Sequence, residues 1–469
     1  MNPIDVAGRI FERAGIISTG RFRSTAELAW PRIVTGFAIM SKQTADLAMV
    51  GIAVGTAGTA GLAFALAYWG LVAMLGLGLA GGTISLVSQN YGGDETERAS
   101  MVVKQSVVVA TVLAVPIGAV FIAFAEPLIA VLGASSTAIP HGRIYLLLVA
   151  PAVLFETLNL IASRTYTGIG DTFTEMIARA TGAVLNVVLS AILIFGLGMG
   201  VAGAAIGTTV STGVVTLVLA WGMTGRSYRG YLGMEPSPVP ITLTGSWVDR
   251  ILLFQLLEIS LPEIGRRLAQ GIVVFPLLWI AASFGPVVVT AFEVARRVRS
   301  LINSVNWGLS LASSSLVGQQ LGMGDEPEAG AYGASIIRLT VVLYACIALA
   351  VVVFATPIAR VFVTGDTEIA QTAIFVAFGA ASAIGQGLDG AATGALIGAG
   401  DTRWPFIASL VGRYVFALPV AALGLFTPLG VGGLYLAFLL EMYVPGGINF
   451  ALFRTGRWKV VSRRYRNPS

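Results

Sequence analysis

The sequence predicts an all-α membrane protein with twelve transmembrane helices in two six-helix parallel repeats, an N-lobe and a C-lobe. The first observation is composition, because 56% of the residues are hydrophobic and only 11% are charged, against roughly 25% in soluble domains. The second is the recurrence of apolar windows of about 20 residues, the length that a helix needs to cross a bilayer. The third is an internal repeat.

The repeat appears as four pairs of similar segments, in the same order in both halves and separated by 230 or 231 residues. The pairs are "SLVSQNYGGDE" (85–95) with "SLVGQQLGMGDE" (315–326), "GIGDT" (168–172) with "GAGDT" (398–402), "VAGAA" from Val201 with "VGGLY" from Val431, and Pro31 with Pro262. A period this long excludes a solenoid of short repeats. The chain is therefore predicted to consist of two similar halves.

Six apolar windows fall in each half. Their centres lie near Met40, Leu71, Val112, Val153, Val188, Thr212, Phe275, Leu309, Ile347, Ala380, Leu410 and Ala437. Each window is too long for a barrel strand, so the spanning segments are predicted to be helices. The predicted parts are an N-lobe (1–225), a cytoplasmic connecting loop (226–250), a C-lobe (251–453) and a basic cytoplasmic tail (454–469).

Loop charges predict the orientation of the chain. Basic residues concentrate near the N-terminus, in the central loop and in the tail: Arg9, Arg13, Arg21, Arg23, Arg226, Arg229, Arg250 and the segment "RTGRWKVVSRRYRNPS". Loops such as "AVGTAGTAG" and "GLGMG" on the other side have no basic residue. By the positive-inside rule, both termini of this multi-pass plasma-membrane protein are cytoplasmic. The net charge of +5 then reflects topology and not nucleic-acid binding.

The sequence offers no enzyme chemistry and no catalytic residue. Cys346 is the single cysteine and His141 the single histidine, which excludes a disulfide framework and Cys- or His-based zinc sites. The segment "GLGLAG" (76–81) matches a dinucleotide-binding pattern, but it lies inside an apolar helix, where small residues favour close helix packing. No cofactor is expected.

Several motifs together resemble the multidrug and toxic compound extrusion (MATE) family. They are "AWPRIVTGFAIMSKQTAD", "SQNYGGDETERA", "GIGDT" and "VLNVVLS…GLGMGVAGAAIGTT", and the branch similar to archaeal and bacterial DNA-damage-inducible MATE proteins is the nearest match. The resemblance implies export of small amphipathic substrates by H⁺ or Na⁺ antiport, through alternating access between the two lobes of a monomer in the lipid bilayer.

The resemblance also implies a cation-coupling site in the N-lobe. Asp46, Asn186 and Thr208 match residues of that branch, whereas Ser190 stands where the branch has a second aspartate. Lys42 is an addition, one helical turn before Asp46 and on the same helix face. Because unpaired buried charge is costly, this ammonium bears directly on how the carboxylate is neutralised.

Three interpretations of this site remain open. Asp46 exchanges a proton, with Lys42 weakening its affinity for that proton. Alternatively, the two residues form a fixed structural bridge and this lobe is poorly coupled. In the third, Lys42 points away, and Na⁺ binds to Asp46, Asn186 and Thr208, with Ser190 alongside. Intramembrane carboxylates are functional by default, which argues against a purely structural Asp46.

The second half lacks this site, since Pro276 or Leu277 occupies the position of Asp46, and Phe416 that of Asn186. It has an ionic cluster of its own, predicted on two helices: Glu258, Glu263, Arg266 and Arg267 on one, and Glu293, Arg296, Arg297 and Arg299 on the other. The pairs Glu263–Arg267 and Glu293–Arg297 have i, i+4 spacing. The cluster either locks these helices together or uses its excess of arginine to receive an anionic group.

Three further polar residues fall inside predicted helices, namely Glu156, Asn159 and Asp389. Asn159 and Asp389 are related by the 230-residue offset, so we expect these residues to line a substrate cleft between the lobes. The alternative is hydrogen bonding between helices, worth about 0.6 kcal/mol on average in membrane proteins. A second function class also stays open, a flippase for lipids or lipid-linked saccharides, since relatives of this fold move such substrates.

Overall fold

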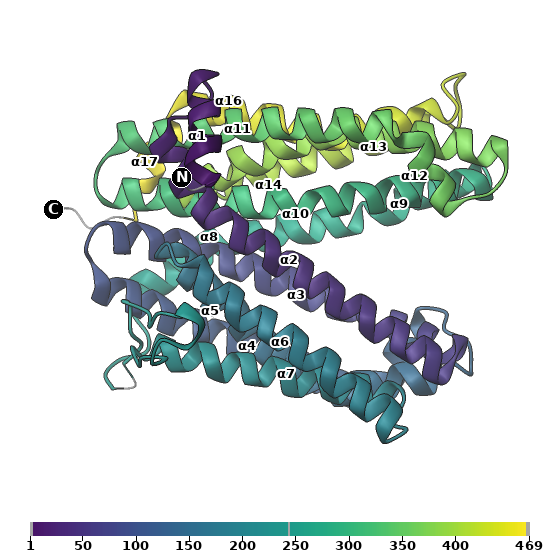
Figure 1. The fold of residues 1–469 in the computed structure, drawn as a ribbon, viewed down its shortest axis with the longest axis horizontal. Coiled ribbons are helices and arrows are strands. Elements are labelled where there is room, and N and C mark those ends of the chain that lie inside the picture. The colour runs from purple at the N-terminus through teal and green to yellow at the C-terminus, as the bar shows by residue number, and fades with distance from the viewer. Residues whose placement is uncertain (1–2, 243, 466–469) are drawn as a thin grey trace. The chain divides into compact units, whose positions relative to one another are not determined.

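The computed structural model describes residues 3–242 and 244–465, and these residues form helices joined by turns and loops, with no β-strand among them (Figure 1). The predicted all-α class is therefore confirmed. Eleven of the described helices are long and apolar enough to cross a membrane. The twelfth is α10 (Pro286–Gly322), which is less apolar because it carries Glu293, three arginines and several serines.

The first half contains six long helices, and a short helix, α1 (Pro3–Arg13), precedes them. They are α2 (Thr19–Val54), α3 (Thr56–Gly92), α4 (Thr96–Val131), α5 (Ile139–Gly168), α6 (Thr172–Ala191) and α7 (Val201–Met223). A π-helical segment, η1 (Ile192–Gly196), extends α6, and a 3-10 turn, η2 (Tyr231–Gly233), lies in the loop after α7. The first six predicted window centres all lie inside these helices.

The second half repeats this order with more interruptions. Its segments are α8 (Arg250–Ile272), α9 (Val274–Ser283), α10, α11 (Glu326–Val353), α12 (Ala355–Phe362), α13 (Asp366–Gly398), α14 (Arg403–Leu410), η3 (Val411–Ala417), α15 (Leu418–Leu423), α16 (Gly432–Thr455) and α17 (Arg457–Ser462). The pairs α8–α9 and α11–α12 each correspond to one predicted span, and α14, η3 and α15 together form another. The other six window centres also lie inside helical segments.

Prolines explain two of these interruptions. A proline removes the hydrogen bond to the carbonyl four residues before it and clashes with that carbonyl. Pro276 stands four residues after Ile272, where α8 ends, and Pro357 stands four residues after Val353, where α11 ends. The sequence therefore sets both breaks locally.

The repeated motifs form the corners between helices. Gly170 (φ 93°) and Gly400 (φ 83°) adopt left-handed backbone conformations in the two Gly-Asp-Thr motifs, which glycine reaches without steric cost. Asp171 and Asp325 each accept a hydrogen bond at 2.9 Å from the backbone N–H three residues further on. Both therefore act as N-caps, of α6 and α11. These two caps belong to different repeated motifs, whereas the left-handed glycine is common to the two Gly-Asp-Thr corners.

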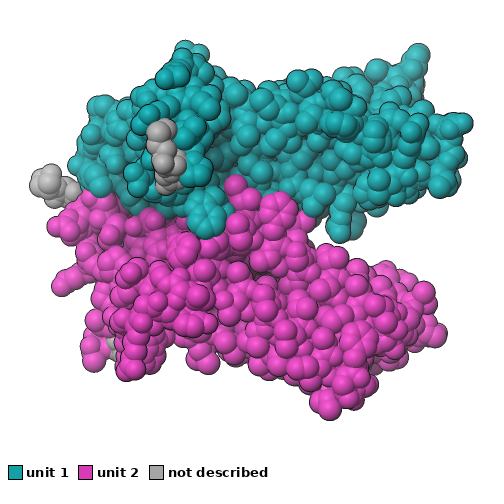
Figure 2. Space-filling view, viewed as in Figure 1, with its two compact units in different colours: residues 1–30, 261–469 teal, residues 31–260 magenta. Residues whose placement is uncertain are grey.

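The described chain divides into two compact units, coloured separately in Figure 2: residues 31–260, and residues 1–30 together with 261–469. The boundaries fall at Pro31 and one residue before Pro262. The start of α2 thus belongs to the second-half unit, where Arg21 makes a two-pronged ion pair with Glu328 at 2.8 and 2.7 Å. The start of α8 belongs to the first-half unit, where the Ser260 hydroxyl donates to a carbonyl of α3. The predicted lobe boundaries follow helix order and remain a prediction.

Each unit has its own apolar core. In residues 31–260 the core lies among α3, α4, α5 and α7, and its large members include Leu62, Trp69, Phe121, Tyr145 and Val149. In the other unit α10 and α13 make the most extensive helix pair, with α11 and α16 packed beside α13. Side chains that point inward from these helices are therefore held by rigid, well-packed elements.

Candidate functional site

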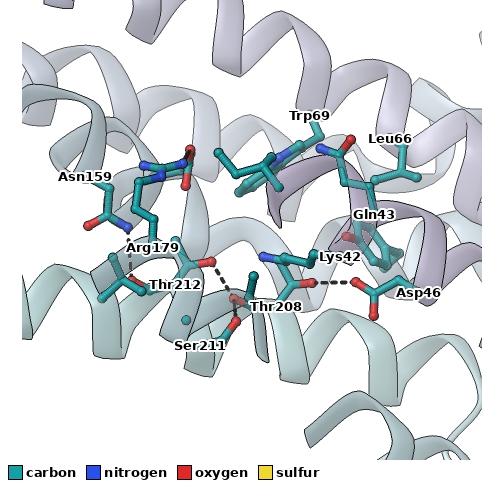
Figure 3. Close-up of a pocket in the computed structure, with 16 residues that line it drawn as sticks. Lys42, Gln43, Asp46, Leu66, Trp69, Asn159, Arg179, Thr208, Ser211 and Thr212 are labelled. Carbon is teal, nitrogen blue, oxygen red and sulfur yellow. Dashed lines mark hydrogen bonds and ion pairs between the residues drawn. The ribbon is translucent and has the colours of Figure 1, made fainter. Parts of the chain in front are cut away.

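A polar cluster lies in the unit formed by residues 31–260, where α2, α6 and α7 meet. The hydroxyl of Thr208 donates to Oδ2 of Asp46 at 3.3 Å, and Nδ2 of Asn186 donates to Oγ1 of Thr208 at 3.2 Å. Figure 3 shows Asp46 and Thr208 facing each other across this junction. Asp46, Asn186 and Thr208 are each less than 5% exposed. The three residues selected by the family resemblance are thus in direct contact.

Close approach of α6 and α7 creates this contact. Asn186 and Ser190 stand four residues apart on α6 and so share one face. A Cβ at Gly207 would lie 2.5 Å from Oγ of Ser190 and 3.0 Å from its backbone nitrogen. Only glycine allows this separation, which places Thr208 beside Asn186. Ser190, where the family branch has an aspartate, is fully buried in the same place.

Three oxygen atoms of this cluster are buried without a hydrogen-bond partner among the described residues: Oδ1 of Asp46, Oδ1 of Asn186 and Oγ of Ser190. Buried polar atoms are normally satisfied, so each such group requires an explanation. Carboxylate, amide and hydroxyl oxygens are the ligands that hard cations prefer. The cluster is chemically suited to a proton on Asp46 or to a small cation.

Lys42 lies one turn before Asp46 on α2 and is half-buried. It lines the same cavity as Asp46, and Figure 3 shows both side chains there. Within the described residues, no carboxylate oxygen comes within 4.0 Å of its ammonium group. The structure therefore has no direct Lys42–Asp46 ion pair, although the charges share one small space. The role of Lys42 stays a prediction.

The cavity has about 60 Å³ of room for water, enough for several water molecules or an ion with part of its hydration shell. Asn159 and Glu156 line it together with Lys42 and Asp46. Asn159 donates to the carbonyl of Thr212 at 3.2 Å, while its own oxygen is buried without a partner in the described chain. Two of the three predicted cleft residues thus line the same cavity as Asp46.

Glu156 belongs to an ionic network that sequence reasoning missed. Arg179 donates to Glu156 at 2.7 Å and lies 3.9 Å from Glu175, which accepts from Arg32 at 2.9 Å. Glu175 and Arg179 are an i, i+4 pair on α6, a spacing visible in the sequence. Arg32 comes from α2, 143 residues away, and no local pattern indicates that contact.

This network changes the charge count around the cavity. Among the described residues around the cavity, Arg32 and Arg179 are matched by Glu175 and Glu156, so the remaining opposite charges are Lys42 and Asp46. A buried carboxylate strongly favours a compensating positive charge. The compensation of Asp46 therefore comes from the nearby ammonium, a proton or a bound cation.

Asp389, the third predicted cleft residue, lies on α13 in the other unit and is buried. Its Oδ1 accepts from Nδ2 of Asn449 at 2.7 Å and from Oγ1 of Thr393 at 3.3 Å. Both donors are neutral groups, and both donate to the same carboxylate oxygen. Asp389 thus has a local hydrogen-bonding role in the structure, and its predicted part in substrate binding is untested.

The predicted ionic cluster of the second half is largely self-paired. Glu263 is buried and accepts from Arg266 at 2.6 Å and from Arg267 at 2.8 Å, which includes the expected i, i+4 pair. Glu293 pairs with Arg296 at 3.0 Å, three residues on, whereas the sequence suggested Arg297 four residues on. The reason is helix geometry, since positions three and four residues away both lie next to a side chain.

A further buried carboxylate, Glu441 on α16, was not predicted. Arg299 donates to it at 2.9 Å, and Nε of Arg413 lies 3.5 Å from it. Both partners are more than 25 residues away in sequence, and Glu441 stands alone in an apolar segment. Its charge inside a predicted span was the only available signal.

These features define a class of protein, a polytopic helical transporter built from two homologous bundles, with ionisable groups buried inside the bundles. The MatE family model matches residues 31–192 and 262–423, two segments that begin at the paired prolines Pro31 and Pro262. The chain belongs to this family, the MATE transporters, and is not an enzyme. The family predicted from the sequence motifs is confirmed, while the assignment to a branch of that family stays a prediction.

Curated relatives align over nearly the whole chain. "Probable multidrug resistance protein NorM" of Bradyrhizobium diazoefficiens is 26% identical over 445 residues, covering 92% of this chain and 93% of that protein. The "FAD transporter" of Shewanella oneidensis is 23% identical, covering 93% and 95%. Among solved structures, a crystal structure of MATE in the bent conformation is similar with a TM-score of 0.85, 21% identity, and coverage of 95% and 97%. At this sequence identity, the similarity is a similarity of fold.

Proposed function

We propose that this protein exports small amphipathic compounds across the plasma membrane in exchange for H⁺ or Na⁺, by alternating access. The NorM relative is named for multidrug resistance, and the family membership supports transport. The basic loops support an orientation with both termini in the cytoplasm. The coupling ion would enter the cluster around Asp46.

One observation carries the coupling proposal: Asp46 is a buried intramembrane carboxylate beside unsatisfied oxygens of Asn186 and Ser190. Binding of a proton or a cation there would remove the cost of an unsatisfied buried charge. We further propose that the affinity for this ion differs between the two transport states. Such a differential affinity is what coupling requires.

A proteoliposome assay tests this proposal. Purified protein is reconstituted, an outward- or inward-directed gradient of H⁺ or Na⁺ is imposed, and transport of a fluorescent cationic dye is recorded. We expect gradient-driven dye transport in the wild type and a loss of the gradient dependence in Asp46→Asn. Asp366→Asn, which alters an exposed carboxylate at the start of α13, serves as the matched control and should behave as wild type.

One further variant distinguishes Na⁺ from H⁺ as the coupling ion. If Na⁺ is the coupling ion, the wild type shows saturable Na⁺ binding and Asn186→Ala abolishes it, because an oxygen ligand is removed. If H⁺ is the ion, transport follows the pH gradient without added Na⁺ and no saturable Na⁺ binding occurs. Dye transport that is indifferent to both gradients, with Asp46→Asn unchanged, would refute the coupling proposal.

A lipid or lipid-linked saccharide flippase is the second candidate. The observation that favours it is the excess of arginine on α8 and α10, where Arg297 is exposed and has no ion-pair partner among the described residues. The same vesicles, loaded with a labelled lipid in place of the dye, test it. Lipid translocation without dye transport would favour the flippase and contradict export of amphipathic compounds.

A further inference from the structure

A second cavity, much larger and mostly apolar, lies between α6 and α7 at the end where the connecting loop begins. It has a volume of about 640 Å³, within the range of pockets that hold small ligands. Apolar side chains from both helices line it, including Ile177 and Leu185 on α6 and Val214 and Val218 on α7. Val214 is exposed, so the cavity is an open groove rather than a closed void.

Polar and aromatic groups gather at one end of this groove. Trp221, Tyr231 and Arg229 line that end, and the guanidinium of Arg226 lies 4.8 Å from the Trp221 ring centre. Neither arginine has a carboxylate within 4.0 Å in the described part of the chain. Glu235 is the nearest acidic residue in the sequence and is exposed. The mouth therefore combines aromatic rings with two unneutralised positive charges.

The loop that carries these groups is held in a defined shape. The hydroxyl of Tyr228 donates to the carbonyl of Val218 at 3.0 Å, and the indole N–H of Trp221 donates to the carbonyl of Ser227 at 3.1 Å. Arg229 adopts a left-handed backbone conformation with φ 54°, which is uncommon for a residue with a side chain. Such conformations persist where surrounding contacts impose them.

We propose that this groove binds one anionic phospholipid, with an acyl chain between α6 and α7 and the phosphate beside Arg226 and Arg229. The groove matches the acyl chain in polarity, and Trp221 and Tyr231 belong to the residue types that sit at the level of lipid headgroups. Arginine donates to phosphate in two-pronged fashion. A neutral small molecule would leave both guanidinium groups without a partner.

The groove also adjoins the coupling cavity. Gly182 and Val215 line both spaces, and a Cβ at Gly182 would lie 2.2 Å from Cγ2 of Val215. One layer of side chains therefore separates a bound acyl chain from the cavity that contains Asp46. Lipid in the groove would restrict the relative motion of α6 and α7 at that contact.

Native mass spectrometry of the delipidated full-length protein tests the proposal. The protein is titrated with phosphatidylglycerol and, separately, with phosphatidylcholine of the same acyl chains. We expect one tightly bound phosphatidylglycerol per chain and weaker phosphatidylcholine binding. Arg226→Ala and Arg229→Ala should each weaken phosphatidylglycerol binding about fivefold, the effect of roughly one basic residue at a lipid surface. Phosphatidylcholine binding should change less.

Two matched variants test the groove itself. Thr181→Phe fills the groove from α6, since Thr181 lines it, and should abolish the tight site. Ala220→Phe adds the same ring on an exposed face of α7 outside the lining and should bind as wild type. Equal affinity for the two lipids, or unchanged phosphatidylglycerol binding in Thr181→Phe and in both arginine variants, would overturn the proposal. Loss of bound phosphatidylglycerol on addition of the cationic dye, with no competing lipid present, would also overturn it.

Discussion

Replacement of Lys42 by methionine should make the protein more dependent on its external coupling ion. Lys42 and Asp46 are the opposite charges left after Arg32–Glu175 and Arg179–Glu156 are paired. For two unit charges taken as about 6 Å apart at an effective dielectric constant of about 20, the attraction is about 3 kcal/mol. Lys42 is half-buried, so solvent screens part of this energy, and we expect roughly a tenfold change in ion affinity.

The assay is dye transport in proteoliposomes at a series of pH values and Na⁺ concentrations. Lys42→Met keeps most of the side-chain volume but removes the positive charge, so the buried carboxylate requires a proton or Na⁺ more strongly. The half-maximal Na⁺ or H⁺ concentration should then fall about tenfold, and the dependence should become steeper. Lys459→Met, which removes an ammonium on α17 outside the cavity, is the control.

A second change tests the same site from α6, which carries Ser190. Ser190→Asp introduces the carboxylate that the family branch has, beside Asp46 and Asn186. In the Lys42→Met background it should strengthen ion dependence further, whereas with Lys42 present the ammonium should offset part of the added charge. Identical Na⁺ and pH dependence in wild type, Lys42→Met and Asp46→Asn would refute the charge argument.

Three other changes have outcomes set by the structure. Gly182→Val should prevent stable folding, since its Cβ would lie 2.2 Å from Val215, whereas Gly70→Val, with no atom within 4 Å, should be tolerated; equal melting temperatures would contradict this. Glu441→Gln should lower the free energy of unfolding by about 3 kcal/mol or more, because it leaves buried arginines unpaired; an unchanged denaturation midpoint would count against it. Asp171→Ala should cost about 1 kcal/mol through loss of the α6 cap and Asp171→Asn much less, as measured by thermal unfolding; equal losses would exclude capping as the cause.

Much of the fold was readable from the sequence because its determinants are local or repeated. Apolar windows, paired motifs and prolines each act within a few residues, so twelve spans and two halves could be predicted. Helix α10 is the exception, because Glu293 and three arginines lower the mean apolarity of the span, and one of them, Arg299, pairs with the distant Glu441. Its apolar window near Leu309 and the repeat together predicted it as a span.

Only part of the candidate site could be predicted from the sequence, for a physical reason. Asp46, Asn186 and Thr208 were found because a family resemblance assigned them, and no periodicity brings them together. The partner of Glu175 on α2 and the partners of Glu441 on α10 and η3 are 143, 142 and 28 residues away. Charge pairs at such separations depend on helix packing, so a lone charged residue in a span indicates that a partner exists but does not identify it.

The buried carboxylates of the two halves have different hydrogen-bond partners, and this difference favours ion coupling in the first half. Asp389 and Glu441 receive hydrogen bonds from side chains of their own unit, so protonation would break favourable contacts. Asp46 accepts one long hydrogen bond at 3.3 Å, and its other oxygen is unsatisfied within the described chain. A proton or a cation therefore gains more free energy at Asp46 than at the other two carboxylates. Coupling through Asp46 alone requires that the second half respond through movement of the helices and not through an ion of its own.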